Sequence, residues 1–588
     1  MAKTSTGSMG GRPMVMSARG VVSSGHYLAT GIGADILRRG GNAFDAAAGA
    51  GFALALLKPH QNGIGGEIPA LLFDAATSRV YAVSGHGTAP AAATMSLYRD
   101  EYGLEIIPGD GLLPSLVPCA PASWIFILEH FGTMRLGDVI AGALDLAENG
   151  FPMYDHLHAS ISRTADRMKR EWPSSAEVFL PGGRAPAPGE LFRNPDWART
   201  FKRLVRAEGR HKARKRGLAA AREEFYEGKV AREVAKFCRN ESFPDASGAS
   251  HGGLLTEEDF AAFEVRLEES VSIVYKELRV HKCGPWTQGP VLCQTLGLLE
   301  GFDLSSMGHN SADYIHTVVE CMKLAFADRE FYYGDDRFVK VPMSRLLSKK
   351  YARERAQLVA SDKASLELRP SGFDPVSVTD VRGVNAAFDA SRHVGDTTKL
   401  EVIDRKGNMA SVTLSGGWLT ASPVLPGMGF PLGTRGQMFS LVEGHPNALA
   451  PGKRPRTTLS PSLATRRGRP AMVFGSPGGD AQDQWALQFL LNVVEFGMSL
   501  QEAVEAPTFW STHWPSSFYP RRCEAGALHI EKRIAAKVRR ELVSRGHVVK
   551  LAGAWQGGNT LAASIDAKTG VRSAAASPRL EPATAAAV

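Results

Sequence analysis

One polar loop that runs directly into a strand constrains this chain more than any other segment. Residues 393–396 read His-Val-Gly-Asp, and an alternating run of apolar and polar residues begins at Thr397. A Lys-Gly-Asn turn follows, and then a second alternating run. This pattern predicts a β-hairpin whose first strand begins at a threonine. Because threonine favours strands on steric grounds alone, a structural role is the more ordinary interpretation of these residues.

A sharper interpretation depends on cleavage of the bond between Asp396 and Thr397. Cleavage would give Thr397 a free α-amine beside its hydroxyl, and this pairing is one way to activate a weak nucleophile. A free α-amine has a reference pKa of about 7.7–8.0, so it can accept the hydroxyl proton near neutral pH. An internal threonine carries no such base on the same residue.

The run from Thr397 to Thr413, TTKLEVIDRKGNMASVT, resembles the start of the small subunit in the γ-glutamyltransferase family. Members of this family are self-cleaving N-terminal-nucleophile hydrolases. The resemblance implies that Thr397 is the nucleophile and that Asp396–Thr397 is the self-cleavage bond. Further segments resemble family signatures, and together they cover most of the chain: GGNAFDAA at 40–47, PHQNGIGG at 59–66, MKLAFADR at 322–329, KRP at 453–455 and GSPGG at 475–479.

The resemblance also implies a fold and a subunit organisation. We expect an α/β protein with the four-layer αββα sandwich of N-terminal-nucleophile hydrolases, built from both fragments of a self-cleaved precursor. Residues 1–396 would form the large subunit and residues 397–588 the small subunit, and the two would stay associated. The resemblance implies no cofactor, and it leaves open whether the chain forms a homo-oligomer.

Supporting roles follow from the same resemblance. Thr413 and Ser415, on the second strand of the hairpin, match hydroxyls that orient the nucleophile. Gly478 and Gly479 match glycines whose backbone N–H groups stabilise an oxyanion. Their turn lies between an expected strand and an expected helix, and the N-terminal end of a helix favours negative charge.

The expected acyl-donor pocket departs from the family pattern. Thr457 and Thr458 match paired hydroxyls that contact the donor carboxylate, but His86 stands where family transferases place a carboxylate-binding arginine. Three positions that hold the donor ammonium group in transferases are also changed, to Gly417, Arg435 and Met438. The Thr-Arg-Gly turn around Arg435 resembles the amidohydrolase branch, which includes oxamate-hydrolase-like and cephalosporin-acylase-like members. Since arginine binds carboxylates well, we expect a small carboxylate-bearing amide as substrate.

Three other functions remain open on the sequence. The chain could be a true γ-glutamyltransferase or glutathione hydrolase, with hydrolysis or transfer as the second step. It could be an unprocessed, non-catalytic binding scaffold. It could bind nucleotides through the glycine-rich turns at 59–67 and 475–479, although neither turn has the Lys-Ser/Thr of a phosphate loop.

Charge and cysteine usage argue against several partners. The net charge of +8 is mild for 588 residues, and much of it lies between Lys202 and Arg216. No aromatic residues are interspersed there to stack on bases, so a solvated helical face is favoured over nucleic-acid binding. The six cysteines form no CxxC pair, which predicts neither a zinc site nor a disulfide scaffold. His316 and Glu320 lie four apart on an expected helix and could hold a metal, but packing is the more ordinary role.

Targeting signals are also absent from the sequence. The first eleven residues contain no apolar core, and no apolar run is long enough to cross a bilayer. We therefore expect a cytoplasmic protein without a membrane anchor.

Overall fold

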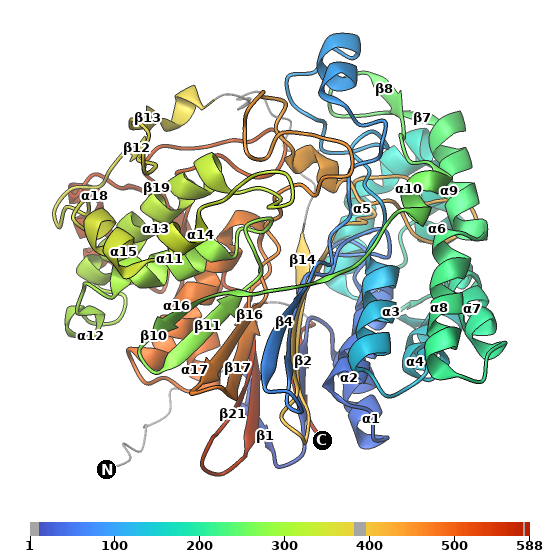
Figure 1. Ribbon diagram of the computed structural model, residues 1–588, viewed down its shortest axis with the longest axis horizontal. Helices are drawn as coiled ribbons and strands as arrows, with labels where there is room; N and C mark the ends of the chain where they lie inside the picture. The colour runs from blue at the N-terminus through green and yellow to red at the C-terminus, as the bar shows by residue number, and fades with distance from the viewer. Residues whose placement is uncertain (1–10, 382–395, 580–581) are drawn as a thin grey trace.

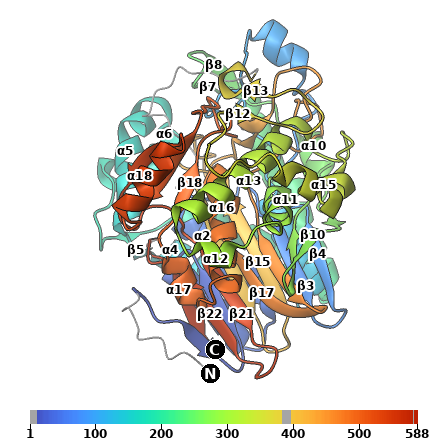
Figure 2. The ribbon, with the colours of Figure 1, turned by 90° about the vertical axis from the view of Figure 1, so that its left-hand side faces the viewer.

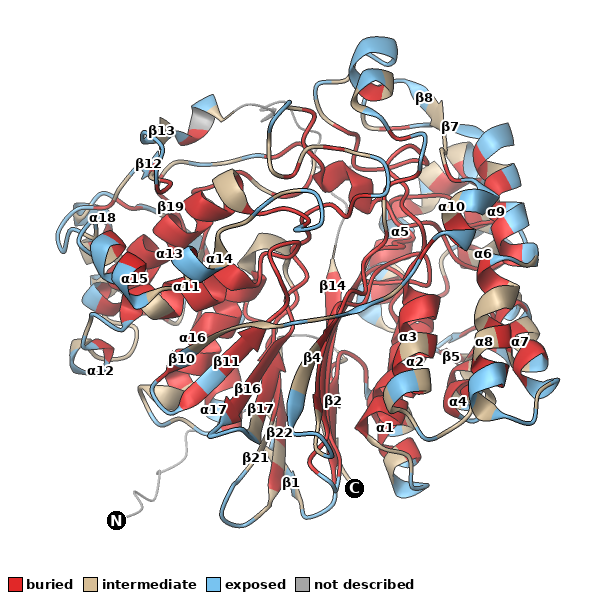
Figure 3. Cartoon of the chain, viewed as in Figure 1, coloured by how far each residue is buried: buried red, intermediate tan, exposed pale blue. Residues whose placement is uncertain are grey.

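The computed structural model describes residues 11–381, 396–579 and 582–588. In this part of the chain, two seven-stranded sheets lie face to face, and helices cover the outer face of each (Figure 1). This is the four-layer αββα sandwich that the sequence predicts. The central strands β14 (Thr397–Ile403) and β15 (Met409–Ser415) are buried along their whole length, whereas edge strands such as β10 (Val271–Tyr275) and the helices at the periphery are partly exposed (Figure 3).

The first sheet carries Thr397 at the start of a central strand, β14. Every neighbouring pair of strands in it is antiparallel. β14 pairs with β15, as the predicted hairpin requires, and on its other side with β2 from the beginning of the chain. The strand order is β23 (Thr584–Ala587), β2 (Val21–Ser24), β14 (Thr397–Ile403), β15 (Met409–Ser415), β3 (Ala70–Asp74), β4 (Arg79–Val83) and β9 (Leu267–Glu268).

The second sheet is also built from segments before and after Thr397. Its strand order is β1 (Val15–Ser17), β22 (Arg572–Ala576), β21 (Leu561–Ile565), β17 (Arg469–Gly475), β16 (Ser462–Arg466), β11 (Leu278–Lys282) and β10 (Val271–Tyr275). The sheet passes between the two segments twice, where β1 pairs with β22 and where β11 pairs with β16. A cut at Thr397 would therefore leave two fragments joined by the hydrogen bonds of both sheets.

One helical layer covers the first sheet and contains the most apolar helix of the chain. α2 is buried along its whole length because it lies between β14 and an outer row of helices. Its start is fixed by a capping box between Asn42 and Asp45. The layer comprises α1 (Tyr27–Arg38), α2 (Ala43–Leu57), α3 (Ala120–Phe131), α4 (Leu136–Asn149), α5 (Asp155–Glu171), α6 (Pro173–Phe179), α7 (Pro195–Gly209), α8 (Arg214–Tyr226), α9 (Lys229–Asn240) and α10 (Glu257–Ala261).

The other helical layer covers the second sheet and faces the viewer in Figure 2. Its central helices are α11 (Pro290–Leu299), α13 (Ala312–Tyr332) and α16 (Gln482–Val494), with α12 (Leu304–Met307), α14 (Met343–Leu346), α15 (Lys349–Ala356), α17 (Leu500–Glu505) and α18 (Ala536–Ser544) around them. Short strands lie outside the two main sheets: β5 (Phe151–Pro152), β6 (Leu191–Phe192), β7 (Ser242–Pro244), β8 (Ser250–Gly252), β12 (Glu367–Leu368), β13 (Val376–Ser377), β18 (Phe509–Ser511), β19 (Ala527–Glu531) and β20 (Val548–Ala552). None of the described helices is both long and apolar enough to cross a membrane.

β14 is buried on both faces, although its alternating sequence is typical of a half-exposed strand. Leu400 and Val402 belong to the core beneath α2. Lys399 and Glu401 form a fully buried ion pair with a 2.7 Å N–O distance, and Ser411 of β15 accepts a further bond from Lys399 at 2.8 Å. The polar face of the strand is therefore neutralised inside the protein.

Replacing Gly51 of α2 by alanine should destabilise the fold, although alanine is the better helix former. An added Cβ would overlap the ring of Trp124 in α3, and overpacking of this kind costs about 1–3 kcal/mol. The gain in helix propensity is only about 1 kcal/mol. Gly31→Ala in α1 is the matched control, because nothing lies within 4 Å of its added Cβ. Thermal unfolding should show a lower midpoint for Gly51→Ala alone, and equal midpoints for the two variants would contradict the packing described.

Candidate active site

Thr397 lies directly opposite Ser415 in the β14–β15 ladder. Its hydroxyl donates to the Ser415 Oγ at 3.2 Å, and the side chain is buried. The register of the hairpin therefore delivers the predicted nucleophile to one of the two hydroxyls expected to orient it.

The backbone carbonyl of Asp396 is held by two side-chain donors. The Ser415 hydroxyl donates to it at 2.7 Å and the Trp418 indole N–H at 2.8 Å. The Asp396 carboxylate accepts the Thr397 amide at 2.7 Å and the Gln61 side chain at 2.6 Å. The uncut peptide bond before Thr397 is thus fixed on both its carbonyl and its amide side.

Arg435 holds the Ser415 hydroxyl in place. Its Nη2 donates to the Ser415 Oγ at 2.6 Å, and its Nε donates to Glu67 at 3.2 Å. The guanidinium carbon lies 4.8 Å from the centre of the Trp418 ring and 5.6 Å from that of Phe518. Arginine is therefore fixed between an acid, a hydroxyl and two aromatic faces, where cation–π contacts add to the hydrogen bonds.

Glu67 is the buried counter-charge of Arg435. Burial raises the pKa of the Glu67 carboxyl to about 7, although the neighbouring guanidinium opposes this shift. Burial also lowers the pKa of Arg435. The backbone of Glu67 pairs with Ser415, and the following Gly416 has a φ of +74° and leaves no room for a Cβ beside the Glu67 carboxylate. The Gly-Gly turn after β15 is what allows the acid to approach.

Thr413 lies two residues before Ser415 and on the same side of β15. Its hydroxyl is buried and makes no hydrogen bond within the described residues. The structure thus brings Ser415 into contact with Thr397, whereas Thr413 makes no direct bond to the nucleophile.

Gly478 and Gly479 form the turn between β17 and a short 3₁₀ segment that leads into α16. Both have positive φ, 125° and 55°, a conformation that glycine adopts without strain. A Cβ on Gly479 would lie 3.0 Å from the ring of Phe518. Phe518 in turn packs against Trp418, with ring centres 6.3 Å apart, so the turn is linked to the Trp418 side chain through one aromatic ring.

The residues expected in the acyl-donor pocket fall into two groups. The Thr457 hydroxyl is used locally, since it accepts the Leu459 amide at 3.3 Å. By contrast, the Thr458 hydroxyl and the His86 Nε2 are buried without a hydrogen-bond partner in the described part of the chain. Burial lowers the pKa of His86 to about 3, so its ring is neutral at pH 7.

Sequence reasoning missed Trp418, Gln61 and Phe518 as site residues, and included Glu67 only as the last residue of the glycine-rich turn at 59–67. The clearest available signal was the position of Trp418 directly after the Gly-Gly turn. A bulky indole at that point must pack into whatever the turn faces. The identity of its hydrogen-bond acceptors depends on tertiary structure.

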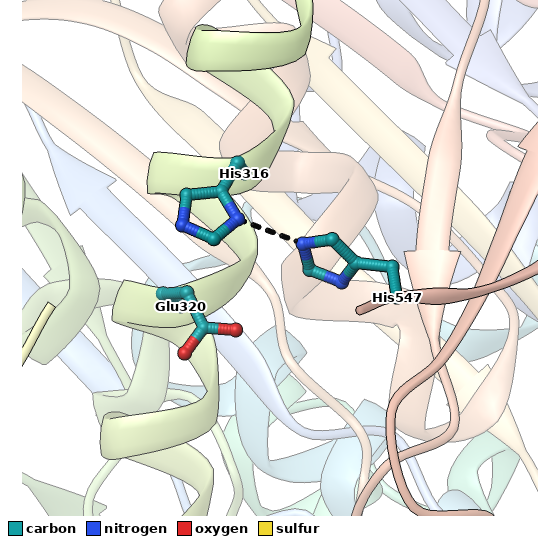
Figure 4. Close-up of side chains that lie close together, drawn as sticks. All are labelled: His316, Glu320 and His547. Carbon is teal, nitrogen blue, oxygen red and sulfur yellow. Dashed lines mark hydrogen bonds between the residues drawn. The ribbon is translucent and has the colours of Figure 1, made fainter. Parts of the chain in front are cut away.

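The possible metal pair of α13 has a third neighbour, His547 (Figure 4). The ligand atoms of His316, Glu320 and His547 lie within 4.8 Å of one another, and the two rings are joined by a 2.9 Å hydrogen bond. Both oxygens of Glu320 are already paired, with Lys323 at 2.6 Å and Arg369 at 3.2 Å. A further cation beside two positive side chains is unfavourable, so the geometry favours a packing role.

The basic run between 202 and 216 lies on α7 and α8 and the turn between them. Several of its charges have partners: Arg216 pairs with Glu223 at 2.6 Å, and Arg214 donates to the Leu128 carbonyl at 2.9 Å. Arg214 therefore helps to pack α8 against α3, whereas Arg216 lies on a solvated helical face.

Stability should depend on pH through Glu67. Its pKa is about 4.5 in the unfolded chain and about 7 in the fold, so the folded state binds more protons between these values. The stabilising contribution is complete below about pH 4.5 and is lost above about pH 7, and it decreases by about 1.4 kcal/mol for each pH unit in between. As the pH rises across this window, the unfolding midpoint of the wild type should fall relative to that of Glu67→Gln, whose side chain does not ionise. A difference independent of pH would contradict the burial of this acid.

Comparisons with known proteins agree with the predicted family and fold. A sequence model of the gamma-glutamyltranspeptidase family matches residues 29–587. The acylase ACY 1 proenzyme of Pseudomonas sp. strain SE83 is 33% identical over 90% of this chain and 87% of its own length. The glutathione hydrolase-like YwrD proenzyme of Bacillus subtilis is 31% identical over 92% and 93%.

Solved structures show the same relationship. The structure of LmbA2991T421A is 42% identical, with a TM-score of 0.93, covering 98% of this chain and all of that one. The cephalosporin acylase of Bacillus halodurans is 29% identical, with a TM-score of 0.83, covering all of this chain and 99% of that one. The curated relatives are proenzymes with acylase and glutathione hydrolase names. The chain is therefore a member of the γ-glutamyltranspeptidase family of autoprocessing hydrolases and acyltransferases.

Proposed function

We propose that this chain cuts its own Asp396–Thr397 bond and then cleaves amides through an acyl-Thr397 intermediate. The observation that carries the proposal is the placement of the Thr397 hydroxyl 3.2 Å from Ser415, next to a carbonyl held by two donors. Residues 1–396 would become the large subunit and residues 397–588 the small subunit. The shared sheets support their continued association after the cut.

Amide cleavage follows in two steps. The freed α-amine of Thr397 accepts the hydroxyl proton as the oxygen attacks the amide carbon, and the amine product leaves with a proton. The backbone N–H groups of Gly478 and Gly479 are the proposed donors to the oxyanion, and removing one such donor typically costs about 10²–10³ in rate. Water then hydrolyses the ester and restores the Thr397 hydroxyl. An acceptor amine in place of water would make the reaction a transfer.

The charges around Arg435 support a carboxylate-bearing substrate. With a Glu67 pKa of about 7, part of the Glu67 population is protonated at neutral pH, and the guanidinium then lacks a full counter-charge. A substrate carboxylate can supply that charge, and a buried unpaired guanidinium is strongly unfavourable without it. Cleavage would also release the Asp396 carbonyl from Ser415 and open the space next to Arg435. The unpartnered His86 and Thr458 atoms are suited to hold the rest of the acyl group.

A true γ-glutamyltransferase or glutathione hydrolase is the second candidate. The glutathione hydrolase proenzyme of Bacillus subtilis is 30% identical over 85% of this chain. Against it, the three positions expected to hold the donor ammonium group contain Gly417, Arg435 and Met438, none of which is an acid. A cationic Arg435 at this place repels an ammonium group.

Self-cleavage should be complete in the wild type and absent from Thr397→Ala. A denaturing gel and intact mass should show fragments 1–396 and 397–588, with Thr397 at the new N-terminus. Thr397→Ser should still be cut, because it keeps the hydroxyl. A wild-type chain that remains whole while it hydrolyses amides would refute the proposal, and a whole, inactive chain would favour a binding scaffold.

The preference for a negatively charged substrate should depend on Arg435. The glutaryl anilide, which has a carboxylate and no ammonium group, should be hydrolysed faster than the γ-glutamyl or the uncharged butyryl anilide. Arg435→Met should lower kcat/KM for the glutaryl compound about tenfold to a hundredfold more than for the butyryl compound, since charge-assisted hydrogen bonds contribute about 1.5–3 kcal/mol. The butyryl anilide controls for the effect of Arg435 on Ser415. Rapid turnover of the γ-glutamyl anilide that Arg435→Ala leaves unchanged would exclude this substrate class.

A further inference from the structure

The carbonyl of Asp396 is held as an oxyanion would be, although it belongs to an intact peptide bond. Its two donors, the Ser415 hydroxyl and the Trp418 indole N–H, lie at 2.7 and 2.8 Å. Donors that stabilise an oxyanion lie about 2.7–3.1 Å from the position that the oxyanion will take, and both of these donors are already this close to the carbonyl oxygen from which it would form. Neither donor belongs to the Gly478–Gly479 turn proposed for the substrate reaction.

We infer that Trp418 and Ser415 form a separate oxyanion site for self-cleavage, with the Trp418 indole N–H as a catalytic donor. This inference rests on the proposed function, because it concerns the cut that the proposed function requires. It assigns self-cleavage and amide hydrolysis to two different sets of donors around one nucleophile.

Trp418 is fixed by contacts on its rings and at its nitrogen. The side chain is fully buried, one face lies against the Arg435 guanidinium, and Phe518 packs beside it. The indole N–H is shared with the Gln61 carbonyl at 3.0 Å, and the Gln61 side chain also binds the Asp396 carboxylate. A donor held in this way needs little reorganisation as charge develops, which is the condition for effective electrostatic catalysis.

The hydroxyl proton of Ser415 can be donated only to the Asp396 carbonyl. Arg435 donates to the Ser415 Oγ at 2.6 Å, and Thr397 donates to it at 3.2 Å. Arginine has no acceptor atom, so it can only be the donor in its pair. With both lone pairs of the Ser415 oxygen occupied, its own O–H must point to the Asp396 carbonyl. Arg435 is therefore a positioning residue for the Ser415 donor.

The step can be written with these atoms. The Thr397 oxygen bonds to the Asp396 carbonyl carbon in a five-membered ring, and the carbonyl π electrons move onto the Asp396 oxygen. The negative charge on that oxygen is stabilised by the Trp418 N–H until Ser415 gives its own proton to the oxygen and takes up the Thr397 hydroxyl proton, which leaves a neutral ring intermediate. Collapse re-forms the carbonyl and breaks the C–N bond. The proton on the Asp396 oxygen returns through Ser415 and ends on the Thr397 nitrogen, which becomes the free amine, and an ester between Asp396 and the Thr397 oxygen remains. Water hydrolyses the ester to the Asp396 carboxylate and the Thr397 hydroxyl.

Trp418→Phe tests the inference because it keeps an aromatic ring against Arg435 and removes the N–H. The full chain is synthesised in a cell-free reaction with a radioactive pulse, and fragments are timed on denaturing gels. The half-life of the precursor should increase about 10²–10³-fold. Trp172→Phe is the matched control, since this buried indole makes no hydrogen bond in the described residues, and it should be cut within about twofold of the wild-type rate.

A second substitution separates the N–H from ring packing. Incorporation of 3-benzothienylalanine at position 418 replaces the N–H by sulfur and retains the bicyclic shape, so it remains informative if Trp418→Phe fails to fold. Ser415→Ala should also slow self-cleavage. Ser415→Thr should be cut faster than Ser415→Ala because it keeps a hydroxyl at this position.

The outcomes distinguish the inference from the proposed function. A wild-type chain that stays whole, or a Thr397→Ala chain that is cut, overturns both. If the wild type is cut and Thr397→Ala is not, cutting of the benzothienyl chain at the wild-type rate overturns the inference alone. Slow cutting of both position-418 variants with normal cutting of Trp172→Phe supports it.

Discussion

Backbone pairing of β14 with β2 on one side and β15 on the other is the interaction on which the site depends. It holds Thr397 opposite Ser415, inside a sheet that is covered on both faces. Strands from before Thr397 pair with strands from after it in both sheets, so the hydrogen bonds that position the residue do not depend on the peptide bond that precedes it. We therefore expect the sheets to keep both segments in place after the proposed cut at Asp396–Thr397.

The ion pair between Glu67 and Arg435 couples two positions that are 368 residues apart. Arg435 departs from the family's transferase pattern, and together with Glu67 it forms one buried unit. Arg435 without Glu67 would be an unpaired buried cation, and Glu67 without Arg435 would be an unpaired acid. Their joint contacts with Ser415 explain why a change in the expected donor pocket also affects the atoms around the peptide bond before Thr397.

The Gly416–Gly417 turn and the Gly478–Gly479 turn have different physical roles. Gly416 and Gly417 permit the close approach of the Glu67 backbone and carboxylate to β15, which forms the support beneath Ser415. Gly478 and Gly479 allow a left-handed turn next to Phe518, at the point where a strand leads into a helix. The first turn thus supports Ser415 and the uncut peptide bond, and the second carries the backbone N–H groups proposed as oxyanion donors.

The sequence by itself determined the hairpin, the position of Thr397 at its start, the four-layer fold and the family. These features are local or are carried by continuous motifs: strand alternation, a turn signal and runs such as GSPGG can be identified without any contact map. Tertiary structure alone decided that Trp418 and Ser415 share one acceptor, that Arg435 is paired with Glu67, and that His547 joins His316. Each of these contacts joins side chains from different segments, and burial sets their protonation as well as their geometry. Neither the geometry nor the protonation of these contacts can be derived from the order of residues along the chain.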